Sequence, residues 1–97
     1  MEAKQGQLRL IASPDGRDGS VVIHQDALLF ASILDQNDAV NYELQSGRTA
    51  YLHLIRGALE VNGQKLTTGD ALKIKDIAAL DIRQASNAEF LLFDLPY

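Results

Sequence analysis

Short runs of apolar residues alternate with polar positions along this chain, and no run keeps the period of an amphipathic helix. Leu59 and Val61 fall on one side of an extended segment, while Glu60 and Asn62 fall on the other. This two-residue period is typical of a strand with one buried face. Turn-forming residues interrupt the runs about every 8 to 12 positions, a spacing that is typical of a β-sandwich or β-barrel. The pattern therefore predicts an all-β protein.

The runs and their interruptions give the expected elements. We expect about nine or ten strands, among them 7–12, 21–24, 27–34, 40–44, 49–55, 58–61, 71–74, 78–82 and 89–95. The strongest turn signal is Asn62-Gly63, because both residues accept the positive φ angles of a tight hairpin turn. No linker or low-complexity segment divides the runs, so residues 1–97 are expected to form a single domain.

Composition and charge narrow the classes of function. The net charge is −4 and the nine Lys and Arg residues are scattered, which argues against a nucleic-acid partner. The chain has no cysteine, so disulfides, thiolate metal sites and cysteine nucleophiles are excluded. No apolar stretch approaches the roughly 20 residues of a membrane span, and residues 1–8 lack the apolar core of a secretory signal. We therefore expect a cytoplasmic protein with no membrane partner.

Three segments carry a resemblance to a known family. GALEVNGQKLTTGDALKI (57–74), with glycines at 57, 63 and 69, resembles the segment between the two conserved motifs of cupins. SPDGRDGSVVIHQDA (13–27) and EFLLFDLP (89–96) resemble the C-terminal cupin half of pirin-like bicupins, a family that includes quercetin 2,3-dioxygenases. The resemblance covers nearly the whole chain. It implies one cupin-type double-stranded β-helix, a jelly-roll barrel.

The resemblance also implies where a metal-binding cupin would carry its ligands, two histidines and a glutamate before Gly57 and a later histidine. Those positions fall near Glu43, Gln45, Ala50 and Leu80. Only Glu43 offers a ligand, and one carboxylate does not hold a transition metal. We therefore expect no metal cofactor and no catalytic residue, and we do not expect this chain alone to be an enzyme, although the family includes dioxygenases.

Other polar residues have structural explanations beside functional ones. His53 lies between Leu52 and Leu54, and strand alternation predicts that the leucines point inward and His53 outward. No serine lies in a G-x-S-x-G nucleophile pattern. Arg48 and Arg56 lie at strand margins, where a guanidinium either binds an anionic ligand with two hydrogen bonds or forms an exposed salt bridge; we favour the salt bridge.

Two functions follow from these expectations. The first is a non-metal cupin domain of the pirin-like family, a structural or interface half that supports a metal-bearing cupin. An apolar face left exposed by such a half marks an interface, so we expect a homodimer or a partner cupin domain.

The alternative is a cupin that binds a small molecule, or a metal-independent enzyme, using the barrel interior. Its candidate polar lining is Tyr42, Glu43, Tyr51 and His53. A filled interior favours the structural role, whereas a cavity with converging polar groups favours binding. A further reading keeps the dioxygenase activity of the family in this chain, which requires a bound metal.

Overall fold

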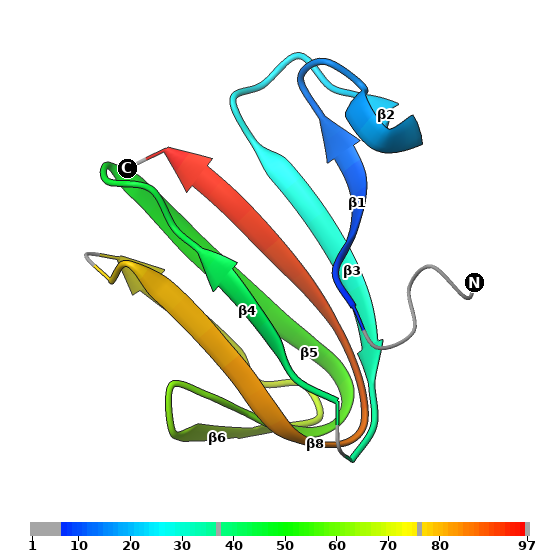
Figure 1. Ribbon diagram of the computed structural model, residues 1–97, viewed down its shortest axis with the longest axis vertical. Coiled ribbons are helices and arrows are strands. Elements are labelled where there is room, and N and C mark those ends of the chain that lie inside the picture. Colours follow the sequence, from blue (N-terminus) through cyan, green and yellow to red (C-terminus); the bar gives the residue numbers. More distant parts are fainter. Residues whose placement is uncertain (1–6, 37, 76, 97) are drawn as a thin grey trace.

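The computed structural model describes residues 7–36, 38–75 and 77–96, and strands make up most of this part of the chain (Figure 1). Its strands are β1 (Arg9–Ser13), β2 (Val21–Val22), β3 (Leu28–Leu34), β4 (Val40–Glu43), β5 (Arg48–Val61), β6 (Gln64–Thr67), β7 (Ala71–Lys75) and β8 (Ala79–Pro96). A short 3₁₀ turn, η2 (Arg17–Gly19), lies between β1 and β2. No helix within these described ranges is long and apolar enough to cross a membrane. The all-β prediction is confirmed.

All eight strands belong to one sheet that bends back on itself, because β5 and β8 are long enough to serve both of its layers. The first part of β5 lies between β7 and the end of β8, and its last part lies between β6 and the start of β8. The end of β8 also pairs with β3, and its start pairs with β4. Figure 1 shows both long strands reversing direction at the lower end of the molecule.

In two places, a pair of strands that we expected to be separate forms one continuous strand. The expected strands 49–55 and 58–61 form β5, and 78–82 and 89–95 form β8. The register between β5 and β8 shifts at several points between Leu54 and Glu60, which is how bulges bend a strand without ending it. The predicted hairpin is confirmed: Asn62 and Gly63 have φ angles of 50° and 85° and join β5 to β6.

The bend depends on a close approach between β5 and β8. Gly57 in β5 has a φ angle of 87°, and a Cβ atom placed on it would lie 2.3 Å from the carbonyl oxygen of Asn87 and 2.5 Å from that of Ser86. On β8, Gln84 and Asn87 have positive φ angles of 53° and 47°, so this strand bends where it meets Gly57. A residue without a side chain is required here by both backbone conformation and space.

Inward side chains from both layers meet in one core, because alternate residues of β5 and β8 point to the same side of the sheet. Phe90 and Leu92 of β8 pair across the sheet with Leu54 and Leu52 of β5, and all four are fully buried. The rest of the core comes mainly from Leu34, Leu59, Val61, Leu66, Ile74, Leu80, Ile82, Ala85 and Ala88. Large apolar side chains therefore fill the interior over most of its length.

We predict that Gly57→Ala lowers the free energy of unfolding by at least about 3 kcal/mol, because the new methyl group adds a backbone clash to the cost of positive φ. The matched control is Gly63→Ala, which has a similar φ of 85° but open space around the new Cβ atom. It should lose only about 1 kcal/mol. Urea unfolding of both variants measures the difference, and equal losses would show that the close approach is unimportant.

Candidate functional site

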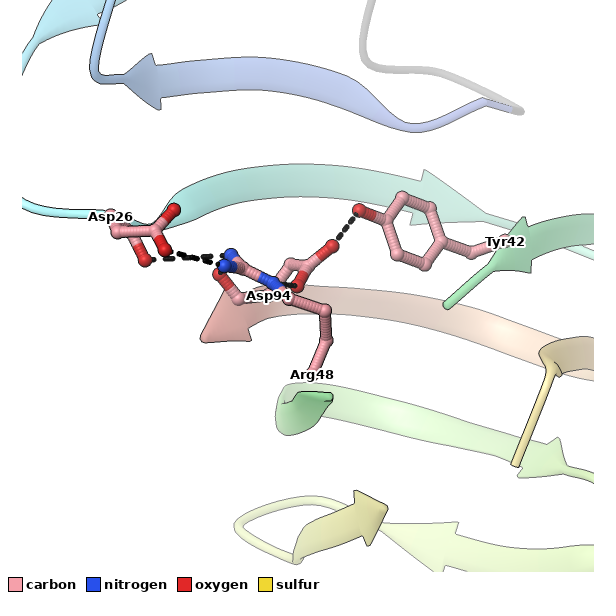
Figure 2. A network of polar contacts seen from close by, with 4 residues as sticks. All are labelled: Asp26, Tyr42, Arg48 and Asp94. Atoms are coloured by element: carbon pink, nitrogen blue, oxygen red, sulfur yellow. Dashed lines mark hydrogen bonds and ion pairs between the residues drawn. The ribbon is translucent and has the colours of Figure 1, made fainter. Parts of the chain in front are cut away.

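Four side chains from different segments form a continuous polar network at one end of the core (Figure 2). Tyr42 on β4 donates its hydroxyl hydrogen bond to Oδ2 of Asp94, near the end of β8. Arg48, the first residue of β5, donates from Nε to Oδ1 of Asp94 and from Nη1 to Oδ2 of Asp26, both at 2.8 Å. Arg48 Nη2 also donates to the backbone carbonyl of Asp94 at 3.0 Å. The network thus ties β4, β5, β8 and the segment before β3 together.

Strand alternation explains why a carboxylate lies inside the fold. Asp94 continues the inward series of Phe90 and Leu92 on β8, and it is only 5% exposed. A buried carboxylate is costly unless hydrogen bonds and an opposite charge compensate for its lost hydration. Tyr42 and Arg48 provide both. Throughout the described part of the chain, no buried side-chain nitrogen or oxygen lacks a hydrogen-bond partner.

The network raises the pKa values of two of its members, Tyr42 and Arg48. Burial, together with the hydrogen bond to the Asp94 carboxylate, raises the pKa of Tyr42 far above its ordinary value of 10.0. The hydrogen bond to Asp94 also raises the pKa of Arg48, against the opposing effect of burial. Tyr42 therefore stays neutral and Arg48 stays charged at neutral pH. Neither group has the pKa of a general acid or base that works near pH 7.

A cavity of about 430 Å³ opens beside the network. Its wall includes Phe30 and Tyr42, whose rings meet edge to face at 5.1 Å. The complete lining is Pro14, Arg17, Asp26, Leu28, Phe30, Tyr42, Glu43, Gln45, Arg48 and Asp94. A second hollow of about 320 Å³ shares Gln45 and Arg48 with it. This end of the molecule therefore combines a partly aromatic wall with fixed charges.

The structure does not bring the four predicted lining residues together. Tyr42 and Glu43 line the cavity. Tyr51 and His53 instead lie on the opposite side of the sheet, where Tyr51 pairs with Phe93 and His53 pairs with Leu91. The physical reason is the alternation of β5, which buries Leu52 and Leu54 and turns the intervening residues outward. The cavity thus retains two of the four expected residues, of which Tyr42 is half-buried and Glu43 is exposed.

The positions expected for metal ligands do not supply a ligand set. Glu43 and Gln45 are exposed, whereas Ala50 and Leu80 are fully buried. Among the residues that the structure describes, no group of three His, Cys, Asp or Glu side chains lies close enough to hold a metal ion. These residues do not fit the metal of the cupin family.

A second feature is the outward face of the sheet, defined here as the side of β1, β3, β8, β5 and β7 that points away from the core. The cross-strand register places mainly apolar side chains on this face. Tyr51 and Ile55 are 37% and 41% exposed, and the Tyr51 and Phe93 rings are 6.0 Å apart. The other apolar members are Ala12, Leu29, Ala31, Ile33, Leu91 and Leu95.

Sequence reasoning singled out Arg48 but not its partners. Arg48 and Arg56 both form salt bridges, as we favoured. The pair of Arg56 with Glu89, at 3.0 Å, is exposed at the arginine as expected, whereas the side chains of Arg48 and Asp94 are only 17% and 7% exposed, so that pair is buried. Arg48 also pairs with Asp26. A signal for Asp94 existed, because it is spaced by two from Leu92 and so shares the inward side of β8. Asp26 gave no comparable signal, since it lies outside any strand.

Comparison with known proteins gives the family. The family model of the quercetinase C-terminal cupin domain matches residues 10–95. Quercetin 2,3-dioxygenase of Escherichia coli is 38% identical over 95 residues, which are 98% of this chain and 41% of that protein. Pirin-like protein YhaK of Escherichia coli is also 38% identical, over 94% of this chain and 41% of its own length.

Solved structures agree with the sequence comparison. The crystal structure of the bacterial pirin YhhW from Escherichia coli in complex with nickel(II) matches with a TM-score of 0.88 and 37% identity, over 92% of this chain and 39% of that one. YhaK matches with a TM-score of 0.82 and 35% identity, over 93% of this chain and 41% of that one. These similarities confirm the cupin-type fold. The chain spans about two fifths of the length of these relatives.

We predict that Arg48→Met lowers the free energy of unfolding by about 2 to 4 kcal/mol, because it leaves the buried Asp94 carboxylate without its counter-charge. The double variant Arg48→Met/Asp94→Leu should be less destabilised than Arg48→Met alone, since it removes the orphaned charge as well. Asp26→Asn is the matched control. Its side chain is 72% exposed, so its loss should cost no more than about 0.5 kcal/mol.

Chemical denaturation of the wild type, these three variants and the single variant Asp94→Leu measures these values. A double variant that loses the sum of the two single effects, with no coupling, would contradict the central role of the ion pair between Arg48 and Asp94.

Proposed function

Because the chain belongs to the quercetinase C-terminal cupin family, we propose that it is a non-metal cupin domain with a structural role, which packs against a metal-bearing cupin and supports that partner's site. The supporting observation is the outward face. Apolar side chains run across its central strands, and two of the large ones, Tyr51 and Ile55, remain more than a third exposed. Apolar patches of this kind usually mark contact surfaces.

The interior supports the same assignment. The core positions that a metal-binding cupin would use hold Ala50 and Leu80, both fully buried among apolar neighbours such as Leu52 and Phe90. A divalent transition metal needs several nitrogen, oxygen or sulfur ligands in one place. YhhW has been solved with nickel(II), and this chain matches 39% of it. We infer that metal chemistry belongs to a cupin unit outside the matched part.

We predict that the purified chain, after dialysis without chelator, holds less than about 0.1 equivalent of nickel, iron, copper or manganese by elemental analysis, because it lacks a ligand set. A chimera tests the structural role. In it, this chain replaces the matched segment of Escherichia coli quercetin 2,3-dioxygenase, and it should fold and retain metal.

A Tyr51→Glu substitution in the chimera should then lower its melting temperature by several degrees, because it places a charge in the buried contact. The matched control is Lys65→Glu, an exposed residue on β6. Near-stoichiometric metal in the isolated chain would favour a dioxygenase activity of its own. Equal melting temperatures of the two chimera variants would contradict the packing role.

A second candidate function is small-molecule binding, and the cavity beside Arg48 favours it. Its volume of about 430 Å³ is in the range of small-ligand sites, and aromatic and charged groups converge on it. Tyr42 and Glu43 would contribute polar contacts, while Phe30 and Leu28 would contact an apolar part of the ligand. This function does not exclude the structural one, because the cavity and the outward face lie on different sides of the sheet.

Ligand-detected NMR with a panel of small aromatic amines, phenols and carboxylates tests this candidate. We predict that binders displace one another and perturb the amide signals of Phe30 and Tyr42. Gln45→Trp, which adds bulk at the cavity wall, should weaken binding about tenfold or more. Gln64→Trp, which lines a different hollow, should not. If no compound in the panel distinguishes the two variants, the cavity is not a binding site for this class.

A further inference from the structure

The outward face has cations at its opposite edges. One row of paired residues crosses the sheet from Val21 to a lysine: Val21, Ala12, Leu29, Phe93, Tyr51 and Lys73. The next row begins with an arginine: Arg9, Ala31, Leu91, His53 and Ala71. A third row ends on β7 at Lys75. Arg9 and Lys73 are both exposed. An apolar centre therefore lies between a cationic β1 edge and a cationic β7 edge.

The charged residues at the edges of this face are positive, whereas the whole chain has a negative net charge. Among the described residues in the paired rows of this face, Glu89 is the one that is acidic. Its carboxylate forms an ion pair with Arg56 at 3.0 Å. The protein as a whole carries a net charge of −4. Among the described residues of the paired rows, the charged side chains at both margins of this face are thus cationic.

We propose that this face selects a partner whose docking surface has an apolar centre and carboxylates at its margins, and that it disfavours a second copy of this chain. The inference rests on the proposed function, because it names the kind of cupin surface that the outward face accepts. Complementary charge at the rim of an interface speeds association and excludes wrong partners, while like charges opposed across an interface cost free energy.

The geometry opposes cations in both aligned face-to-face arrangements of two copies. Six strands about 4.8 Å apart give a row about 24 Å wide, with Lys73 at one end. Face-to-face packing brings the β7 edge of one copy over either the β7 edge or the β1 edge of the other. In the first case the β7 lysines of the two copies share one edge, and in the second they share it with Arg9 of the other copy, which lies one row from the row of Lys73. Both arrangements oppose cations.

The length of the relatives supports a separate cupin unit as the partner. This chain accounts for about two fifths of Escherichia coli quercetin 2,3-dioxygenase. The relatives therefore contain more than enough further sequence for a second domain of this size. The chemistry inferred for that partner surface, apolar with acidic margins, follows from the residues of this chain alone.

A charge-reversed form of this chain is a suitable probe, because it keeps the same apolar centre and changes only the margins. The variant Arg9→Glu/Lys73→Glu is mixed with the wild-type protein and followed by sedimentation equilibrium at about 50 mM and about 500 mM salt. The mixture should form a one-to-one complex whose dissociation constant is at least about tenfold lower than that for self-association of either protein. High salt should weaken this complex and strengthen the self-association of the wild type, because it screens attraction in one case and repulsion in the other.

The matched control is Lys65→Glu/Arg83→Glu, which reverses two exposed cations that both pair with Glu60 in the other layer of the sheet. Mixing it with the wild type should give no gain. A wild-type homodimer that is tightest at low salt, or a mixture with no measurable complex, would overturn the inference.

A further variant separates this inference from the proposed function. Tyr51→Ser, made in both members of the mixture, removes part of the apolar centre and leaves the charges, and it should weaken the complex about tenfold or more. If association depends on Tyr51 but not on charge, the docking role stands and the selection by charge is wrong. If association is independent of Tyr51, the outward face is not the docking surface, and the proposed function fails with it.

Discussion

The contact between Gly57 and the backbone at Ser86 and Asn87 is the constraint on which the rest of this structure depends. Two strands can bend together only if their backbones approach closely at the corner, and the missing side chain of Gly57 leaves that space. The shared bend lets β5 and β8 belong to both layers of the sheet. It also returns the end of β8 to the start of β5, where Arg48 is opposite Pro96. The polar network is a result of that return.

The same two strands carry both features to which we assign a role. On β8, Phe93 and Leu95 point outward, and Asp94 between them points into the fold. On β5, Tyr51 faces outward beside Leu52, which is buried. The outward face and the cavity are therefore separated by the thickness of one sheet. A partner on the outward face would lie against the same strands whose inward side carries Asp94 and Arg48.

Local patterns were sufficient to predict much of the fold. The alternation around Leu59 and the Asn62-Gly63 dipeptide are properties of neighbouring residues, and the hairpin formed where they indicated. The continuity of β5 and β8 was not predictable in this way, because a glycine inside an apolar run signals a turn and a bulge equally well. Only the approach of β8, distant in sequence, decides between them.

The site was less predictable for a related reason. Tyr42 and Glu43 were identified as lining residues because they are polar residues on an expected strand. Tyr51 was included on the same basis, although the two-residue period that buries Leu52 excludes it from the interior. Asp26 and Asp94 are partners of Arg48 across 22 and 46 residues of sequence. No local pattern encodes a pairing over such distances, which is fixed by the order of the strands.

The ion pair between Arg48 and Asp94 has one more consequence, which concerns how the last strand is aligned. A displacement of β8 by a single residue would exchange the environments of Phe93 and Asp94, placing an aromatic ring beside the guanidinium and a carboxylate among the apolar residues of the outward face. Apolar residues stand on both sides of this strand, so hydrophobicity alone discriminates weakly between the two alignments. The buried charge supplies the missing discrimination. The ion pair between Arg48 and Asp94 therefore stabilises one register of β8 relative to the registers displaced by one residue.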